Sequence, residues 1–147
     1  MKDMKTYIHL LLLGALVISG CGRSGTWTDD SKNWQRAFRS VKPDDVVVVH
    51  SKYWRSPHFT FEFQYFFHIK TNQKLHEQLF ESNSLEQIQD TNAVSAAWQF
   101  FGDKPEWFLP KPPEKYEVWM YREEPKQNFK VFIDKDNKDL FLTDYQV

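Results

Sequence analysis

The chain of 147 residues has a single cysteine, Cys21, and five glycines, two of which lie in its first 20 residues. A single thiol excludes an intramolecular disulfide, so the fold must be stabilised by packing. So few glycines leave little material for a loop that cradles a phosphate or a dinucleotide. No cofactor is therefore expected.

The chain also lacks an excess of charge of one sign, since 19 Lys and Arg face 20 Asp and Glu. Nucleic-acid-binding domains are usually basic, so no nucleic-acid partner is predicted. The sequence has no Gly-x-Ser-x-Gly elbow and no phosphate-binding loop, which favours a non-enzymatic protein. Aromatic residues, in contrast, make up 17% of the chain. Such large side chains are typical of a core or of a binding surface.

The first 20 residues have the anatomy of a secretory signal peptide. Lys2 and Lys5 are basic, residues 8–18 are mostly apolar, and the small residues Ser19 and Gly20 follow. A membrane-spanning helix requires about 20 apolar residues, and this run is shorter. We therefore expect the segment to be removed rather than folded.

The end of this segment, Ile18-Ser19-Gly20-Cys21, resembles the lipobox of bacterial lipoproteins. The resemblance covers residues 1–21 only. It implies cleavage before Cys21, diacylglycerol on its sulfur and a fatty acid on the new amine. Gly22, where an Asp would favour the inner membrane, implies the outer membrane, facing the periplasm, if the cell is Gram-negative. An ordinary secretory signal with an incidental cysteine is the alternative.

The expected domain organisation follows from this reading. Residues 1–20 form the signal peptide, residues 21–31 a lipidated tether, and residues 32–147 a single domain. Ten extended tether residues span about 33 Å. The domain is thus expected in the cell envelope, close to the membrane that holds its lipid anchor.

Apolar residues that alternate with polar ones predict an antiparallel sheet. Strands are expected at 46–49, 59–69, 116–122, 129–134 and 140–145. The longest of these should bury one face and leave the other largely polar, with residues 53–58 as its link to the first strand. Residues 85–89 fit no element clearly.

Three helices are expected from capping residues and periodicity. The first extends from Ser31 to Ser40, with Trp34 and Phe38 on one face, and the second begins at Thr71 or Asn72. The third is capped by Asn92, and Gly102 stands where a helix-ending glycine belongs. The predicted fold class is α+β, with a four- to five-stranded antiparallel sheet and two or three short helices packed on one face.

A stiff segment between Pro105 and Pro113 contains Trp107, Phe108 and Leu109. Proline restricts this backbone, and ordered apolar residues bind at a low entropic cost. The three apolar residues are candidate partner-binding residues. The alternative is that they form a lid on the core.

Three histidines on or near neighbouring strands, His50, His58 and His68, are weak candidates for a metal site. Solvent-facing histidines are commoner on strands, so no metal is predicted. His76 and Glu77 begin like a zinc-protease helix, but Phe80 occupies the place of the second histidine.

Paired carboxylates are the enzymatic feature that is hardest to exclude from a sequence. Glycosidases need two acids about 5 to 10 Å apart, and Glu62 with Glu117 is the candidate pair. Solvated charges on a sheet surface are the favoured alternative.

These observations predict a membrane-anchored envelope lipoprotein whose domain is a non-enzymatic module that binds an envelope protein. The rival hypothesis is a peptidoglycan or glycan binder, or a cell-wall hydrolase. It rests on four tryptophans that are suited to stack on sugar rings, Trp27, Trp54, Trp107 and Trp119. The sequence leaves the identity of the partner and the oligomeric state open.

Overall fold

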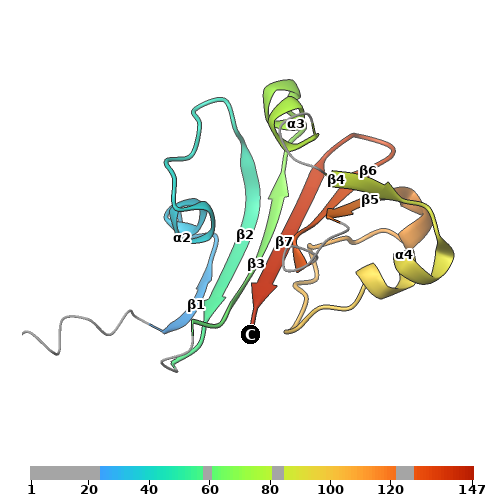
Figure 1. Ribbon diagram of the computed structural model, residues 1–147. Helices are drawn as coiled ribbons and strands as arrows, with labels where there is room; N and C mark the ends of the chain where they lie inside the picture. Colours follow the sequence, from blue (N-terminus) through green and yellow to red (C-terminus); the bar gives the residue numbers. More distant parts are fainter. Residues whose placement is uncertain (1–23, 58–60, 81–84, 122–127) are drawn as a thin grey trace, which may run out of the picture.

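The computed structural model describes residues 24–57, 61–80, 85–121 and 128–147, which form an α+β domain (Figure 1). Its strands are β1 (Gly25–Thr28), β2 (Val48–Arg55), β3 (Phe63–Ile69), β4 (Leu85–Ile88), β5 (Tyr116–Tyr121), β6 (Lys130–Asp134) and β7 (Leu140–Gln146). Its helices are α2 (Asn33–Phe38), α3 (Gln73–Phe80), α4 (Thr91–Ala97) and the 3-10 turn η1 (Pro113–Lys115).

The described strands form one antiparallel sheet in the order β1-β2-β3-β7-β6-β5-β4. The strands β1 to β3 form one meander and β4 to β7 a second. The pairing of β3 with β7, from Phe63 opposite Gln146 to Ile69 opposite Leu140, joins the two. The sheet has seven strands, so the prediction of four to five was wrong. The unexpected strands are β1 and β4, which have four residues each, too few for a clear alternation.

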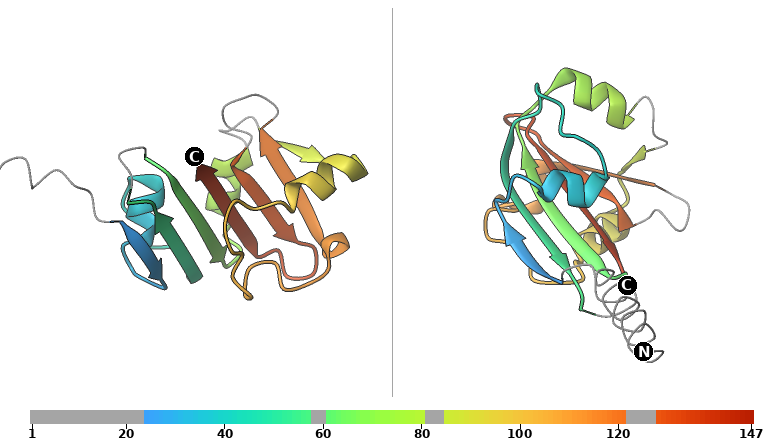
Figure 2. Two further views of the ribbon diagram at one scale, coloured as in Figure 1. Left: turned by 90° about the horizontal axis from the view of Figure 1, so that it is seen from below. Right: turned by 90° about the vertical axis from the view of Figure 1, so that its left-hand side faces the viewer.

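Both faces of the sheet are buried, because successive residues of a strand point to opposite sides. Phe67 belongs to a core cluster that also contains Trp34 of α2 and Leu75 of α3. Its neighbour Phe66 belongs to a second cluster, with Ala97 of α4 and Phe108. The helices therefore cover opposite faces (Figure 2). The prediction that they pack on one face was wrong.

The expected polar face of the longest strand is also buried. Gln64 and Phe66 are 3% and 2% exposed. The segment that follows α4 covers these two side chains. The alternation of residues within a strand cannot show whether a distant segment packs over its polar face. The described strand begins at Phe63 rather than at residue 59, and residues 58–60 lie outside the described part.

The expected tether is partly a strand. Gly25–Thr28 forms β1 and pairs with β2 from Arg55 to Lys52, so the domain begins before residue 32. Cys21 and Gly22 lie outside the described residues. The strand β2 likewise extends through residues 53–55, which the sequence analysis placed in a link.

The three predicted helices are confirmed in position, but two of their caps differ from the prediction. The residue before α2 is Lys32, which forms no side-chain cap bond, so Ser31 is not its cap. In α2, Trp34 and Phe38 share a face as expected, with ring centroids 4.5 Å apart. Asn72 caps α3, and its Oδ1 accepts a hydrogen bond from the Leu75 amide at 2.8 Å. The cap of α4 is Asp90 rather than Asn92. The predicted strands of the C-terminal meander are confirmed by the pairing of β5, β6 and β7.

One carboxyl group on β7 is poorly solvated. Asp144 lies opposite Tyr65 in the β3–β7 pairing, and burial raises the pKa of Asp144 to about 6. The Tyr145 amide donates a hydrogen bond to Asp144 Oδ1 at 2.9 Å and opposes this rise only in part. The folded state thus favours the protonated carboxyl group.

Replacement of Asp144 with Asn is expected to stabilise the fold at neutral pH. Between about pH 4 and pH 6 the folded state of the wild type binds more protons than the unfolded state, so its stability falls as the pH rises. The variant should lack this fall and gain up to about 3 kcal/mol at pH 7. Urea unfolding across this pH range measures it. The exposed Glu106→Gln variant is the control, and equal pH dependence in wild type and D144N would contradict the prediction.

Candidate functional site

Two of the three candidate histidines lie side by side. His50 of β2 is opposite His68 of β3, and their ring centroids are 6.3 Å apart. Each ring has a carboxylate of its own. His50 Nδ1 lies 3.3 Å from Asp29 Oδ2, and His68 Nε2 lies 2.9 Å from Asp139 Oδ2. The third candidate, His58, lies outside the described residues.

Both rings are also parts of aromatic stacks. His50 stacks on Trp107 with a centroid distance of 5.3 Å, and His68 stacks on Phe141 at 4.4 Å. Among the described residues, no group of three or more His, Cys, Asp or Glu side chains is placed to hold a metal ion. The structure thus gives His68 a packing role at the point where β3 and β7 meet.

The buried carboxylate of Asp139 ties the end of β3 to the β6–β7 turn. Besides His68, it accepts hydrogen bonds from Lys70 Nζ at 2.9 Å and from the Thr71 amide at 3.4 Å. Burial alone would raise the pKa of Asp139, but the hydrogen bonds from His68 and Lys70 outweigh it and lower the pKa below its ordinary value. The ionised carboxylate is therefore the form that the fold selects.

The proline-rich segment is largely part of the core. Phe108 and Leu109 are 0% and 3% exposed, and a buried side chain presents no surface to a partner. The lid interpretation therefore holds for these two residues. Trp107 is half-buried, so it alone of the three candidates is accessible.

Residues 101–107 lie along β2 on the face that bears the second core cluster. Lys52 Nζ donates to the Asp103 carbonyl at 3.0 Å. The ring centroids of Trp54 of β2 and Phe101 are 5.9 Å apart. These contacts fix a segment that has no regular secondary structure against the sheet.

The candidate carboxylate pair is far apart. Glu62 precedes Phe63 at one end of β3, whereas Glu117 is opposite Ile133, which is aligned with Leu140 and hence with the other end of β3. Three strand spacings and about seven residues along the strands separate them, which is on the order of 27 Å. A glycosidase pair requires about 5 to 10 Å, so this candidate site was wrong.

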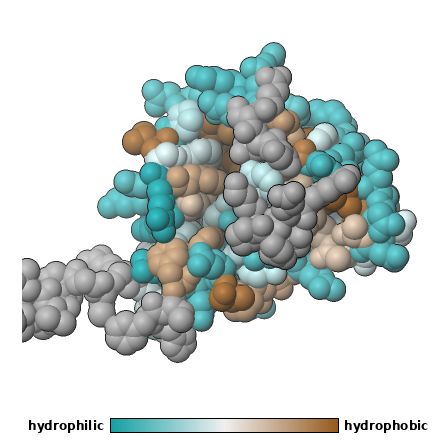
Figure 3. All heavy atoms as spheres, in the orientation of Figure 1, coloured by the Kyte–Doolittle hydropathy of each residue, from teal (hydrophilic) through white to brown (hydrophobic). Residues whose placement is uncertain are grey.

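The four tryptophans do not form one platform. Trp27 and Trp119 pack against the first core cluster, whereas Trp54 and Trp107 lie on the opposite face. Large exposed apolar side chains are likewise scattered, and on the face shown in Figure 3 they form separate patches. Binding is thus better sought in the cavities of this domain than on a broad flat surface.

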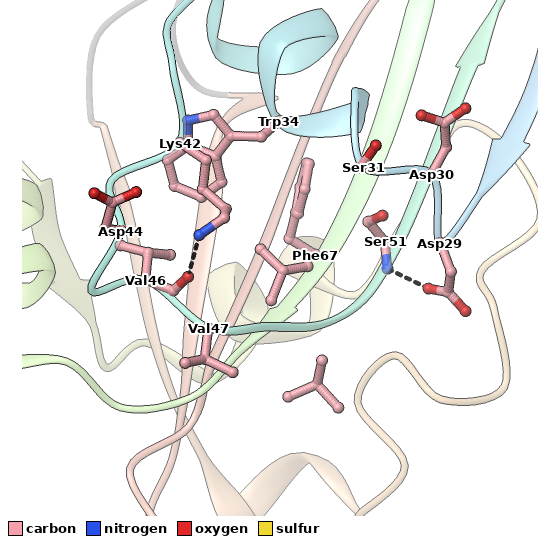
Figure 4. A pocket seen from close by; sticks show the side chains of 12 residues that line it. Asp29, Asp30, Ser31, Trp34, Lys42, Asp44, Val46, Val47, Ser51 and Phe67 are labelled. Carbon is pink, nitrogen blue, oxygen red and sulfur yellow. Dashed lines mark hydrogen bonds between the residues drawn. The ribbon is translucent and has the colours of Figure 1, made fainter.

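One cavity, of about 430 Å³, lies between α2, the loop 39–47 and β2. We call it the α2 cavity. Its apolar lining includes Trp34, Val46, Val47 and Phe67, and its polar residues include Asp29, Asp30, Lys42 and Asp44. Figure 4 shows these side chains around the opening, with the Lys42 amine turned to the Val46 carbonyl at 2.6 Å.

A second cavity, of about 240 Å³, lies on the opposite face and is called the Gln64 pocket. It is lined by Lys52, Trp54, Gln64, Phe66, Phe101, Gly102 and Asp103. The Gly102 amide donates to Gln64 Oε1 at 2.6 Å, but Gln64 Nε2 is buried and has no hydrogen-bond partner among the described residues. A buried donor without an acceptor destabilises the fold, so a ligand whose oxygen accepts a hydrogen bond from Gln64 Nε2 would gain binding free energy.

A Cβ atom at residue 102 would lie 2.9 Å from Gln64 Oε1, so a larger residue there would displace the Gln64 amide. The sequence pattern predicted that Gly102 follows the end of the third helix and that Gln64 lies on a polar strand face. The one available clue was a lone glycine beside Phe100 and Phe101. The pairing of Gly102 with Gln64 joins residues 38 positions apart, and no local pattern encodes it.

No protein-family model matches the chain, and no curated protein or solved structure gives a significant match. In the described part of the chain, no helix is long and apolar enough to cross a membrane. The site must therefore be interpreted from its own chemistry.

Replacement of Asp139 with Ala is expected to lower the free energy of unfolding by about 2 to 3 kcal/mol at pH 7, because His68, Lys70 and the Thr71 amide lose their shared acceptor. The wild-type carboxylate stabilises the fold above its unfolded pKa of about 4, and this contribution is lost as the pH falls through its lower folded pKa. The difference between variant and wild type should thus shrink in acid. Urea unfolding measures both.

The control is Asp136→Ala, which removes an exposed acid that pairs with Lys111 and Lys115. Exposed ion pairs contribute little, so its loss should be smaller. Equal effects of the two substitutions would contradict a special role for the buried carboxylate.

Proposed function

We propose that this protein is a bacterial envelope lipoprotein, anchored to the membrane through Cys21, whose domain is a non-enzymatic module that binds another envelope protein. The resemblance of residues 18–21 to a lipobox supports the anchor. The strand β1 begins at Gly25, four residues beyond Cys21, and four residues span at most about 14 Å. The domain is then held at the membrane surface, at the outer membrane if the cell is Gram-negative.

The observation that carries the binding role is the α2 cavity with its exposed apolar border. The loop beside the cavity exposes Val41 to 87% and Val47 to 56%. Val47 lines the cavity, Val41 is adjacent to the lining residue Lys42, and Trp34 and Phe67 provide apolar walls. A partner side chain in the cavity would bury this surface, with a gain of about 25 cal/mol for each Å².

Charge indicates the chemistry of the partner. Asp29, Asp30 and Asp44 lie around the cavity, while the amine of Lys42 is held by the Pro43 and Val46 carbonyls. This polar border favours a segment in which an apolar side chain is flanked by Lys or Arg. Complementary charge of this kind mainly directs the encounter and selects the partner.

Replacement of Val47 with Asp is expected to abolish the complex. A charge in an apolar contact loses its hydration, and the yield of cross-linked heterocomplex in intact cells should fall at least about tenfold. Chemical cross-linking at several linker lengths, followed by immunoblotting, measures it.

The matched control is Val147→Asp, because Val147 is also exposed, at 67%, but lies at the C-terminus. Its complex should persist. Recovery of monomer alone from the wild type, or an equal loss in both variants, would contradict the proposal.

A second candidate, glycan binding, is favoured by the Gln64 pocket. Phe101 is 50% exposed and stacks with Tyr145 at 5.9 Å, so a flat aromatic wall borders the pocket. The unpaired Gln64 Nε2 provides a donor for a hydroxyl or carbonyl oxygen. Apolar walls with a few polar groups are typical of sites for small polar ligands.

For this candidate, Phe101→Ala is expected to reduce retention on peptidoglycan sacculi at least about tenfold, because a buried aromatic ring contributes about 1.5 to 3 kcal/mol. Co-sedimentation of the purified protein with sacculi measures the retention. Val147→Ala should bind as the wild type does. If the wild type is not retained, the glycan candidate is excluded.

A further inference from the structure

A third cavity, of about 390 Å³, lies near the edge of the sheet formed by β1. It is lined by Trp27, Arg36, Arg39, Tyr53, Arg55 and Phe61, and we call it the arginine pocket. All three arginines in the described part of the chain line this one cavity. No acidic residue is among its lining residues. A concentration of guanidinium groups in one concave site attracts anions.

Aromatic rings hold the guanidinium groups in place. Arg36 lies over the Trp27 ring at 4.5 Å, and Arg55 lies over the Phe61 ring at 4.4 Å. Arg39 approaches the same Phe61 ring at 5.5 Å. Stacking on a ring leaves the N–H groups at the edge of a guanidinium free to bind an anion.

Two of the three charges are not neutralised. Arg36 pairs with Asp30 at 3.1 Å and also donates to Asn33. Neither Arg39 nor Arg55 forms an ion pair with an acidic residue of the described ranges. The pocket therefore presents a net positive charge.

The backbone at Arg39 has a conformation that is unusual for arginine, and its amide closes the last turn of α2 by donating to the Gln35 carbonyl at 2.9 Å. Arg39 ends α2 with φ 51° and ψ 27°, in the left-handed region. Gly or Asn is the usual residue in this conformation, because a larger side chain is disfavoured there. Strained residues of this kind often occur at functional sites. Here the conformation directs the guanidinium to Phe61 and to the pocket.

The pocket also adjoins β1, which is the first described strand after Cys21 in the sequence. Gly25 is opposite Arg55 in the β1–β2 pairing, and Gly25 is four residues from Cys21. This part of the argument rests on the proposed lipid anchor. With Cys21 in the membrane, four residues place Gly25 within about 14 Å of it, which is close to the level of the lipid headgroups.

We propose that the arginine pocket binds the phosphate group of an anionic phospholipid headgroup. Guanidinium groups bind phosphate oxygens through paired hydrogen bonds, and the uncompensated charges of Arg39 and Arg55 suit a singly charged phosphodiester. The lipid contact would then fix the orientation of the domain on the membrane, which a single anchor point at Cys21 does not do by itself.

The test uses the full chain in a neutral detergent and isothermal titration calorimetry. The probes are dihexanoylphosphatidylglycerol, dihexanoylphosphatidylcholine, glycerol phosphate and inorganic phosphate. We expect phosphatidylglycerol to bind most tightly, since the choline cation of phosphatidylcholine opposes the arginines. In R39N/R55Q its affinity should fall at least about tenfold, because hydrogen bonds between charged groups are lost.

A matched control, K74Q/K135Q, removes two exposed charges far along the chain and should retain the affinity of the wild type. The single variant R39N should melt at or above the wild-type temperature, because Asn tolerates the left-handed conformation. Loss of binding without loss of stability thus separates a ligand role from a structural one.

Equal binding of phosphatidylglycerol and phosphatidylcholine, or equal losses in R39N/R55Q and K74Q/K135Q, would overturn the proposal. Inorganic phosphate binding as tightly as phosphatidylglycerol would also overturn it, in favour of a free phosphate ligand.

The proposed anchor is tested separately by the mass of the Cys21 peptide from cells and by a Cys21→Ala chain in the same calorimetry. An unlipidated Cys21 with intact phosphatidylglycerol binding would contradict the proposed anchor and support the proposed phosphate site in the arginine pocket. A lipidated Cys21 with phosphatidylglycerol binding that R39N/R55Q leaves unchanged would support the anchor and contradict the phosphate site.

Discussion

The pairing of β3 with β7 is the interaction on which the rest of this structure depends. It joins two meanders that are built from different halves of the chain, along a register that extends from Phe63 opposite Gln146 to Ile69 opposite Leu140. Because β3 thereby becomes an interior strand, its successive side chains enter separate cores. Phe67 packs below α2 and α3, and Phe66 packs below α4 and residues 98–109. Asp139 secures one end of this pairing through His68 and Lys70.

The same sheet geometry places the three cavities on its two faces. Strand β2 contributes to all of them, because alternate residues point to opposite faces. Ser51 lines the α2 cavity, and Tyr53 and Arg55 line the arginine pocket on the same face. Lys52 and Trp54 line the Gln64 pocket on the other face. A module of this size can thus present an apolar site, a polar aromatic site and a basic site on the two faces of one sheet.

Much of the secondary structure was predictable from local pattern. The C-terminal strands, the Trp34–Phe38 face and the Asn72 cap depend on residues a few positions apart, and the structure confirms them. The short strands β1 and β4 were not predictable, since four residues cannot show a clear period. The candidate sites were less predictable than the secondary structure. Glu62 and Glu117 are at opposite ends of the sheet, Phe108 and Leu109 are buried, and His50 and His68 are neighbours that serve different carboxylates.

The sequence by itself determined the period of each long strand, the class of the fold and the expectation of a lipidated Cys21, because these depend on short stretches of adjacent residues. The tertiary structure alone decided which strands pair, that both faces of β3 are covered, and that Gln64 and the three arginines line cavities. The physical reason is sequence separation. Gln64 meets Gly102 across 38 residues, and Asp139 meets Lys70 across 69. Contacts over such a sequence separation depend on how the two meanders associate. That association is determined by the simultaneous burial of the two core clusters.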